Sequence, residues 1–449
     1  MPSECVFRVM GVAVLVVLVS CLDDAAAQGR VGAEPSVAAV PSEVVHWPEF
    51  RGPHGNGHVT ATDIAPMVWS ETENVAWKTE IPLIGWSSPV VLGDQIWLTT
   101  SPKKGKDFYV IQVNAKTGEI EFNERIFRVD DPEPLNNPVN SFASPTPAIE
   151  PGRVYVHFGT YGTACIDTNT KEVLWKREDI RIRHLRGPGA SPIIWEDLLL
   201  LNMDGIDFQF QTALNKDTGE MVWITQRTAV WNDFDQNDVI IREGDKRKSF
   251  STPKIVNVNG EDLLLSAGSF AFYGYNPRNG REVFKVSHTS YTPQTRPVVL
   301  DNVMFLTTGY EPTHFMAARI DGKGDVTDSH ILWDFEDRDI PLTPSPTIVD
   351  GLLYLTGDKG TIMCLEPETG EIIWKERIGG NYIASPIYVG GHLYFFSTQG
   401  KTVIMKPGRE PIIVQENRLD DGLMASAAMH NSSLILRSKT HLYRIDPEK

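Results

Sequence analysis

Cysteine is scarce in this chain, which has four in 449 residues. No C-x-x-C-H motif is present, and this absence excludes a covalently attached c-type haem. The motifs G-x-S-x-G and H-E-x-x-H are also missing, which removes common arrangements for a hydrolase nucleophile and a zinc protease. The sequence therefore contains no recognisable catalytic motif, and we predict no catalytic residue.

Positive charge is in deficit as well, because 42 Lys and Arg stand against 58 Asp and Glu, a net charge of −16. Nucleic-acid binding depends on concentrated Lys and Arg, so we expect no nucleic-acid partner. Apolar residues are not in deficit: 41% of the chain is hydrophobic and 22% is charged, which favours a folded domain over disorder.

Long apolar runs are missing too. The run Val9–Val19 has 11 residues, whereas a bilayer span needs roughly 20. Arg8 precedes it, and together they indicate an export signal over residues 1–27. We therefore expect a periplasmic or cell-envelope protein.

Two processing sites compete within this signal. Leu18–Cys21 resembles a lipobox, which would leave a lipid anchor on Cys21, and Ala25–Ala27 is an ordinary A-x-A site for soluble export. Both alternatives remain open, and a membrane is expected as a partner only through the anchor. We interpret residues 28–45 as a linker and residues 46–449 as the folded domain.

Glycine and proline are plentiful, with 36 and 30 residues. They recur at fixed positions of a unit that repeats along residues 73–446. Each unit opens with a small residue and Pro, continues through β-rich segments, makes a turn resembling x-x-T-G-E and ends on an aromatic strand. The opening pairs are Ser88-Pro89, Ser144-Pro145, Ser191-Pro192, Thr252-Pro253, Arg296-Pro297, Ser345-Pro346, Ser385-Pro386 and Ser426-Ala427.

The aromatic of the last strand follows the polar residue that starts the turn by eight positions in five units. These aromatics are Phe122, Trp175, Trp223, Phe284 and Trp374, while Trp333 follows an insertion in the fifth unit and Val414 replaces the aromatic in the seventh. Asp or Asn starts such a turn by bonding its own backbone, and Gly supplies the positive φ of the return. We expect the aromatics to wedge between neighbouring units and to be structural.

Four-stranded units at this period predict an all-β fold, an eight-bladed β-propeller with four antiparallel strands in each blade. The last unit ends at Asp446, where its fourth strand is missing, and residues 73–81 around Trp77 have the fourth-strand pattern. The N-terminal segment is thus predicted to complete the last blade and to cover its exposed edge.

Only two cysteines, Cys165 and Cys364, fall within the repeats. They occupy the same position in the second and sixth units, on opposite sides of a ring. A disulfide needs Cα atoms within about 7 Å, so we predict two buried free thiols.

The pattern S-P … x-D-x-x-T-G-E-x-x-W resembles the pyrroloquinoline-quinone (PQQ) repeat of quinoprotein alcohol dehydrogenases. The same repeat occurs in BamB, an eight-bladed lipoprotein of the outer-membrane barrel-assembly machinery. The segment Trp47–Gly57 also resembles the start of exported PQQ-like propellers of planctomycete-type bacteria, and we interpret it as a plug in which Arg51 bonds backbone carbonyls.

The dehydrogenase resemblance implies PQQ with Ca²⁺ held by Glu, Asn and Asp, and usually a disulfide between adjacent cysteines. No adjacent cysteine pair exists here, and no such trio can be aligned. PQQ and Ca²⁺ are therefore implied by resemblance alone, and we expect neither. Residues 233–238 resemble half of a Ca²⁺ loop, but Gly244 replaces the closing Glu, so we predict a solvated acidic loop.

Connections from each outer strand to the next inner strand should surround one mouth of the propeller, where function concentrates. They carry a basic cluster, an acidic patch at Asp233, Asp235 and Asp238, and aromatic surface. Our candidate binding residues are Trp86, Arg181, Arg183, His184, Arg186, Trp231, Phe234 and Tyr291.

We therefore predict a non-catalytic, monomeric binding or scaffold propeller of the cell envelope, similar to the BamB lipoproteins. Its partner would be an envelope protein or peptide, with a glycan as another candidate. The alternatives are a quinoprotein-like enzyme that uses PQQ and Ca²⁺, and a carbohydrate-binding propeller.

Overall fold

The structure is a computed structural model that describes residues 46–59, 64–231 and 233–448. The predicted export signal, the linker at 28–45 and the lipidation candidate Cys21 lie outside the described residues. The chain divides into two units, Met1–Pro41 and Ser42–Lys449, and everything below concerns the second.

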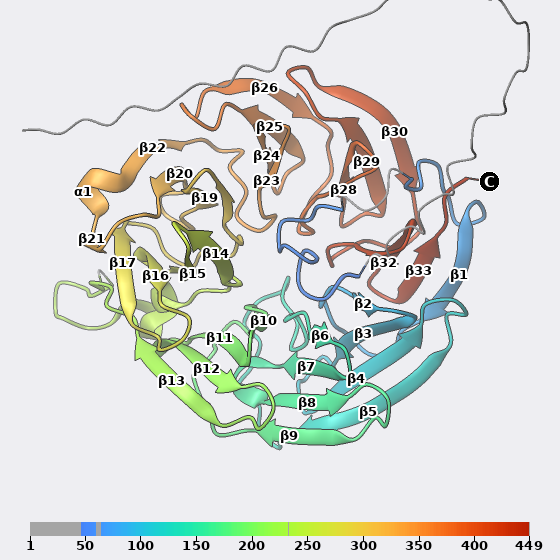
Figure 1. Ribbon diagram of the computed structural model, residues 1–449, viewed down its shortest axis with the longest axis horizontal. Coiled ribbons are helices and arrows are strands. Elements are labelled where there is room, and N and C mark those ends of the chain that lie inside the picture. Colours follow the sequence, from blue (N-terminus) through green and yellow to red (C-terminus); the bar gives the residue numbers. More distant parts are fainter. Residues whose placement is uncertain (1–45, 60–63, 232, 449) are drawn as a thin grey trace, which may run out of the picture. The chain divides into compact units, whose positions relative to one another are not determined.

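Eight small sheets stand in a ring around a common axis (Figure 1), which confirms the predicted eight-bladed β-propeller. From the axis outward, the first two blades are β2 (Val90–Leu92), β3 (Gln95–Thr100), β4 (Asp107–Asn114) and β5 (Ile120–Arg128), then β6 (Ala148–Glu150), β7 (Arg153–His157), β8 (Thr163–Asp167) and β9 (Val173–Arg177). The next two are β10 (Ile193–Trp195), β11 (Leu198–Asp204), β12 (Gln209–Asn215) and β13 (Met221–Gln226), then β14 (Lys254–Val258), β15 (Glu261–Gly268), β16 (Ala271–Tyr275) and β17 (Glu282–Ser287).

The other half of the ring follows the same order. The fifth and sixth blades are β18 (Val298–Leu300), β19 (Val303–Thr307), β20 (His314–Arg319) and β22 (Ile331–Glu336), then β23 (Thr347–Val349), β24 (Leu352–Thr356), β25 (Thr361–Leu365) and β26 (Ile372–Arg377). The last two are β27 (Ile387–Val389), β28 (His392–Phe396), β29 (Lys401–Lys406) and β30 (Ile412–Arg418), then β31 (Ala428–His430), β32 (Ser433–Arg437), β33 (His441–Ile445) and β1 (Val75–Glu80).

Helical structure is confined to short connections in the described part of the chain: η1 (Gly159–Tyr161), η2 (Ile241–Arg247) and α1 (Thr327–His330). None of the helices there has the length and apolar character that crossing a bilayer requires.

The N-terminal strand β1 closes the ring, as the sequence predicts. It pairs antiparallel with β33, and Trp77 lies opposite Arg444 while Lys78 lies opposite Tyr443. Two strands at opposite ends of the chain thus complete the eighth blade, and the edge of β33 is covered.

One blade departs from the predicted four strands. The insertion in the fifth unit contributes β21 (Gly324–Asp325), which pairs parallel with β17 on the outer edge of the fourth blade. The extra strand arises because the insertion between β20 and β22 extends to the fourth blade. There it pairs with the backbone N–H and C=O groups on the outer edge of β17.

The prediction of Ser144-Pro145 as the opening pair of the second blade is wrong by two residues. Strand β6 starts at Ala148, directly after Thr146-Pro147, and the backbone N–H of Ser88 donates to Thr146 Oγ1 at 2.9 Å. Ser144 belongs to the preceding loop, where its hydroxyl bonds Asn140. Both dipeptides fit the pattern, and only the strand register distinguishes them.

Opening residues of neighbouring blades are joined by hydrogen bonds from a backbone N–H to the next hydroxyl. Further bonds of 2.9–3.0 Å run from Thr146 to Ser191, Ser191 to Thr252, Arg296 to Ser345, Ser345 to Ser385 and Ser385 to Ser426. We call these opening residues the hydroxyl ring. The small residue of each S-P pair therefore serves to link blades around the axis.

In five of the eight blades an outer tryptophan contacts the following blade, which agrees with the structural role predicted for these residues. Their Nε1–H groups donate to carbonyls of the following blade at 2.9–3.1 Å, from Trp77 to Ala115, Trp175 to Lys216, Trp223 to Pro277, Trp333 to Pro367 and Trp374 to Gly408. The first four indoles also lie against the turn glycine of that blade, at Gly118, Gly219, Gly280 and Gly370.

One turn explains why glycine is needed at the others. In the second blade Lys171 replaces Gly, with φ 67°, and the preceding blade offers Phe122 in place of Trp. At Gly370 an added Cβ would lie 2.8 Å from the Trp333 ring. The smaller ring of Phe122 thus leaves room for the side chain of Lys171, whereas a Trp at this position goes together with a turn glycine.

We expect Gly370→Ala to destabilise the fold by about 1–3 kcal/mol more than Gly351→Ala. Both glycines lie in the sixth blade with nearly the same φ, 74° and 75°, so the backbone strain of Ala is equal. Nothing lies within 4 Å of a Cβ at Gly351, whereas Gly370 faces Trp333. Urea denaturation measures the difference, and equal losses would show that the Trp–turn contact does not matter.

Cys165 and Cys364 are free and buried, as predicted. Burial raises the pKa of the Cys165 thiol to about 12 and that of Cys364 to about 11, so both remain protonated near neutral pH. They belong to separate apolar clusters, in the second and sixth blades.

Candidate functional site

The loops that connect each outer strand to the next inner strand form one face, which we call the upper face. These connections contribute residues from every blade to a pocket of about 200 Å³ on the axis. The hydroxyl ring contributes six lining residues, which are Ser88, Thr146, Ser191, Thr252, Ser385 and Ser426. Amides of Asn137, Asn140 and Gln294 and aromatic rings of Trp86, Phe250 and Tyr310 line it as well.

Phe50 of the N-terminal segment also lines the pocket, and other residues of that segment bond to inner strands. Trp47 exchanges two backbone hydrogen bonds of 2.8 Å with Val91, and Tyr388 N–H donates to Gly57 O at 2.8 Å. The segment, drawn in blue at the centre of Figure 1, is therefore the predicted plug and closes the pocket below.

Two arginines hold the plug. Arg296 donates from Nη1 to Phe50 O at 2.6 Å and forms an ion pair of 2.9 Å with Glu49. Arg51 is buried and donates from Nη2 to Asn56 O at 2.8 Å, as predicted, while Nε and Nη1 have no hydrogen-bond partner among the described residues. Burial, with the nearby charge of Arg296, lowers the pKa of Arg51 to about 9.

The basic cluster predicted as a binding surface is largely neutralised by acidic residues. Arg186 makes a bidentate pair with Asp245 at 2.9 and 2.6 Å, and Arg183 lies 3.3 Å from Glu133 and 3.2 Å from Glu243. Arg181 is exposed and forms no ion pair within the described chain.

His184 is not a surface residue, contrary to the prediction. Its side chain is 1% exposed and contacts the Tyr161 hydroxyl, while Nδ1 accepts the Gly187 N–H at 2.8 Å. Burial, with the charge of Lys248, lowers the pKa of His184 to about 4, so the ring is neutral at pH 7. It organises the loop that carries Arg186 and offers nothing to a partner.

The four predicted aromatics separate into different environments. Tyr291 is buried, contrary to the prediction, and stacks on Tyr310 with ring centroids 6.2 Å apart. Trp86 lines the pocket, and its indole N–H is buried without a hydrogen-bond partner among the described residues. Trp231 is half-buried beneath Arg247, and Phe234 is 47% exposed.

The longest connection, residues 227–253 without 232, corrects the prediction of a solvated acidic loop. Asp233 is fully buried, and its carboxylate accepts bonds of 2.8 and 3.0 Å from Arg247. Asp235 and Asp238 remain exposed. Within the described residues no group of His, Cys, Asp or Glu could hold a metal ion.

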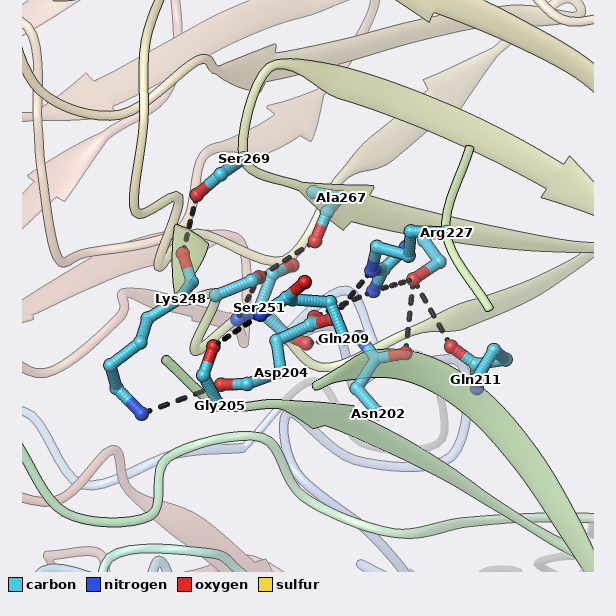
Figure 2. Close-up of polar contacts among 12 residues, drawn as sticks. Asn202, Asp204, Gly205, Gln209, Gln211, Arg227, Lys248, Ser251, Ala267 and Ser269 are labelled. Carbon is cyan, nitrogen blue, oxygen red and sulfur yellow. Dashed lines mark hydrogen bonds and ion pairs between the residues drawn. The ribbon is translucent and has the colours of Figure 1, made fainter. Parts of the chain in front are cut away.

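A buried polar network anchors the base of this loop between the third and fourth blades (Figure 2). Arg227 and Asp204 are fully buried and form a bidentate pair at 2.6 and 2.7 Å, and Arg227 also donates to Ser266 at 2.9 Å. Ser266 continues the chain of bonds to Asn202 at 2.9 Å. Lys248 reaches the Asp204 carbonyl only at 3.4 Å, and burial lowers its pKa to about 8.

Sequence reasoning missed this network and the pocket floor. A signal existed for the network, because Asn202 and Asp204 interrupt an otherwise apolar strand, and charged residues are rarely buried unless they are paired. The partner Arg227 lies in another strand connection, so the pairing itself could not be predicted.

The residues of the pocket do not fit PQQ with Ca²⁺. Calcium takes six or more oxygen ligands, usually with carboxylates among them, and PQQ itself carries several carboxylates that need cationic partners. Not one of the described residues that line the pocket is charged. We therefore derive no reaction step through this cofactor.

Comparison with known proteins supports the repeat type. A family model described as outer membrane protein assembly factor BamB matches residues 319–406. No curated protein matches the chain.

Solved structures share the fold at low sequence identity. BamB from Moraxella catarrhalis is 11% identical with a TM-score of 0.55, over 82% of this chain and 99% of that chain. A europium-containing methanol dehydrogenase is 10% identical with a TM-score of 0.64, over 87% and 89%. The quinohemoprotein alcohol dehydrogenase from Comamonas testosteroni is also 10% identical, with a TM-score of 0.64, over 90% and 81%. The chain thus shares its β-propeller fold with an assembly factor and with dehydrogenases, and its residues 319–406 match the repeat model of the assembly factor.

Proposed function

We propose that this propeller is a non-catalytic binding protein of the bacterial cell envelope that docks a protein or peptide partner on its upper face. The observation that supports this is which side chains of residues 227–253 are buried and which are exposed. Two acidic side chains of this loop, Asp233 and Asp245, are buried in ion pairs with arginines. Four apolar side chains face solvent instead: Val230 is 82% exposed, Phe234 47%, Val239 59% and Ile240 40%.

This arrangement is unusual for a surface loop. Asp233 is held by Arg247 from within the loop, and Asp245 is held by Arg186 from the neighbouring blade. The backbone is further tied by a bond of 2.7 Å from Ile241 N–H to Asp233 O. Exposed apolar side chains that are close together on a loop tied by ion pairs and backbone bonds support an interaction site.

The likeness to an outer-membrane assembly factor supports an envelope location, and the predicted export signal agrees with it. A lipid anchor at Cys21 remains the alternative to soluble export. An enzymatic function is the competing proposal, and PQQ with Ca²⁺ is expected to give no dye-linked alcohol oxidation with the purified protein.

Crosslinked affinity purification from the native envelope tests the docking function. We expect Val239→Ser/Ile240→Ser to reduce the crosslinked partner roughly tenfold, because about 1.4 kcal/mol of apolar contact is lost. The matched control is Val222→Ser/Ile224→Ser on β13, where the same residue types are 49% and 51% exposed. If both variants capture the same partners as the wild type, the loop is not the docking site.

A further inference from the structure

The axial pocket supports an inference beyond the docking loop. We infer that it binds an uncharged sugar, such as the end of a neutral glycan. The residues concerned are distinct from the exposed side chains of residues 227–253, so the two proposals can fail separately.

The hydroxyl ring supplies the first argument. Thr146, Ser191, Thr252, Ser385 and Ser426 each accept one backbone N–H from the preceding blade. A hydroxyl also has one proton to donate, and none of these five donates to another described residue. The lining of the pocket therefore presents several O–H donors that suit a ligand rich in acceptor oxygens.

The walls add side-chain amides that offer a free acceptor oxygen and a free donor NH₂ group. Gln294 Nε2 donates to the Tyr310 hydroxyl at 3.1 Å, which leaves its carbonyl oxygen as an acceptor. Asn137 Oδ1 accepts the Val139 N–H at 2.8 Å, which leaves its NH₂ group as a donor. Asn140 is held by Pro188 O at 2.9 Å and positions the wall. Adjacent donors and acceptors match a sugar, in which every hydroxyl needs both.

Aromatic rings provide the apolar component. Trp86 and Tyr310 line the pocket on different connections, and the Trp86 indole N–H lacks a partner among the described residues. A pyranose ring has an apolar C–H face that packs on an aromatic ring, and a Trp N–H commonly finds an acceptor when it is buried. A ligand with an apolar face could pack on these aromatic rings, and one of its oxygens could accept the Trp86 N–H.

The absence of charge decides between a neutral and an ionic ligand. Although 22% of the chain is charged, none of the described residues that line the pocket is. Arg296 occupies the opening position of the fifth blade, where the other blades have a small residue. Its guanidinium pairs with Glu49 and donates to Phe50 O of the plug and to Pro253 O of the neighbouring blade. A buried anion would therefore lack a direct ion pair, which makes its desolvation unfavourable.

Isothermal titration calorimetry on the folded chain tests this inference with cellobiose, maltose and diacetylchitobiose as probes. We expect at least one to bind, and glucuronate to bind no better than the buffer control. Trp86→Leu and Gln294→Glu should each weaken binding roughly tenfold, the latter by adding a charge at constant shape. Trp231→Leu is the matched control, because this half-buried Trp lies outside the pocket.

The inference is overturned if none of the three probes binds, if glucuronate or PQQ binds more tightly, or if Trp86→Leu and Gln294→Glu leave the affinity unchanged. Circular dichroism on each variant confirms that the fold is retained. Val239→Ser/Ile240→Ser should leave sugar binding intact, and Trp86→Leu should leave partner capture intact. Loss of both activities in either variant would show one shared site instead of two.

Discussion

Arg227→Met is expected to destabilise the propeller by about 3–5 kcal/mol, the cost of leaving a buried charge without its partner. Arg227 and Asp204 have no exposed side-chain surface. Burial raises the pKa of Asp204, and the charge of Arg227 opposes that rise. Without the guanidinium, the carboxylate loses two hydrogen bonds and must either stay unpaired or take up a proton.

The same substitution also removes contacts beyond the ion pair. Arg227 donates to Ser266 at 2.9 Å, and its guanidinium carbon lies 5.1 Å from the centre of the Tyr273 ring. Because Arg227 begins the long loop, we expect its loss to loosen the base of residues 227–253. Urea denaturation gives the free energy of unfolding, and hydrogen exchange locates the loosened segment.

Arg278→Met provides a matched control. Arg278 also pairs with carboxylates, from Glu196 and Asp197, and lies 4.7 Å from the Trp195 ring, but its side chain is 47% exposed. An exposed pair of this kind contributes about 0–1 kcal/mol. A double variant, Asp204→Leu/Arg227→Met, should recover most of the stability. If Arg227→Met costs no more than Arg278→Met, the buried pair does not support the fold.

Trp77→Ala is expected to open the ring at its closure and to cost about 2–4 kcal/mol, which is less than the cost for a fully buried Trp because Trp77 is half-buried. The indole donates to Ala115 O at 3.0 Å and lies against Gly118 of the first blade. Its strand is held to β33 by non-covalent contacts, since the two strands lie far apart in the sequence and no short connection joins them.

Trp374→Ala tests whether closure matters beyond the contact itself. Trp374 makes the equivalent bond to Gly408 at 3.1 Å, but its strand lies between blades that are already joined by the chain. We expect both variants to lose similar stability, and only Trp77→Ala to show faster proteolysis within residues 64–81. Equal cleavage in the two variants would mean that β1 is no weaker than an internal strand.

Several features of the fold could be predicted because each is encoded within a few neighbouring residues. The Asn114 turn is an example: its side chain accepts the N–H of Lys116 at 2.9 Å, and Gly118 follows with φ 77°. The same spacing recurs from unit to unit, so the blade count and the role of Trp77 followed from it. The error at Ser144-Pro145 arose where two adjacent S/T-P pairs gave the same local signal.

The candidate site could be predicted only in part. The loops were identified correctly as the rim of a mouth, and Trp86 does line the pocket there. His184 and Tyr291 were misplaced, because burial depends on which loops cover them. The same is true of Asp233, whose charge would face solvent if Arg247 lay elsewhere.

The sequence by itself determined the eight repeated units, the closure by Trp77 and the two free thiols at Cys165 and Cys364, because turn chemistry and strand periodicity act over short distances. Only the tertiary structure decided that Arg186 of the upper loops pairs with Asp245, and that the described residues lining the axial pocket carry no charge. The physical reason is that ion pairing and burial depend on side chains from different blades. These residues lie far apart in the sequence, so local sequence patterns do not reveal their contacts.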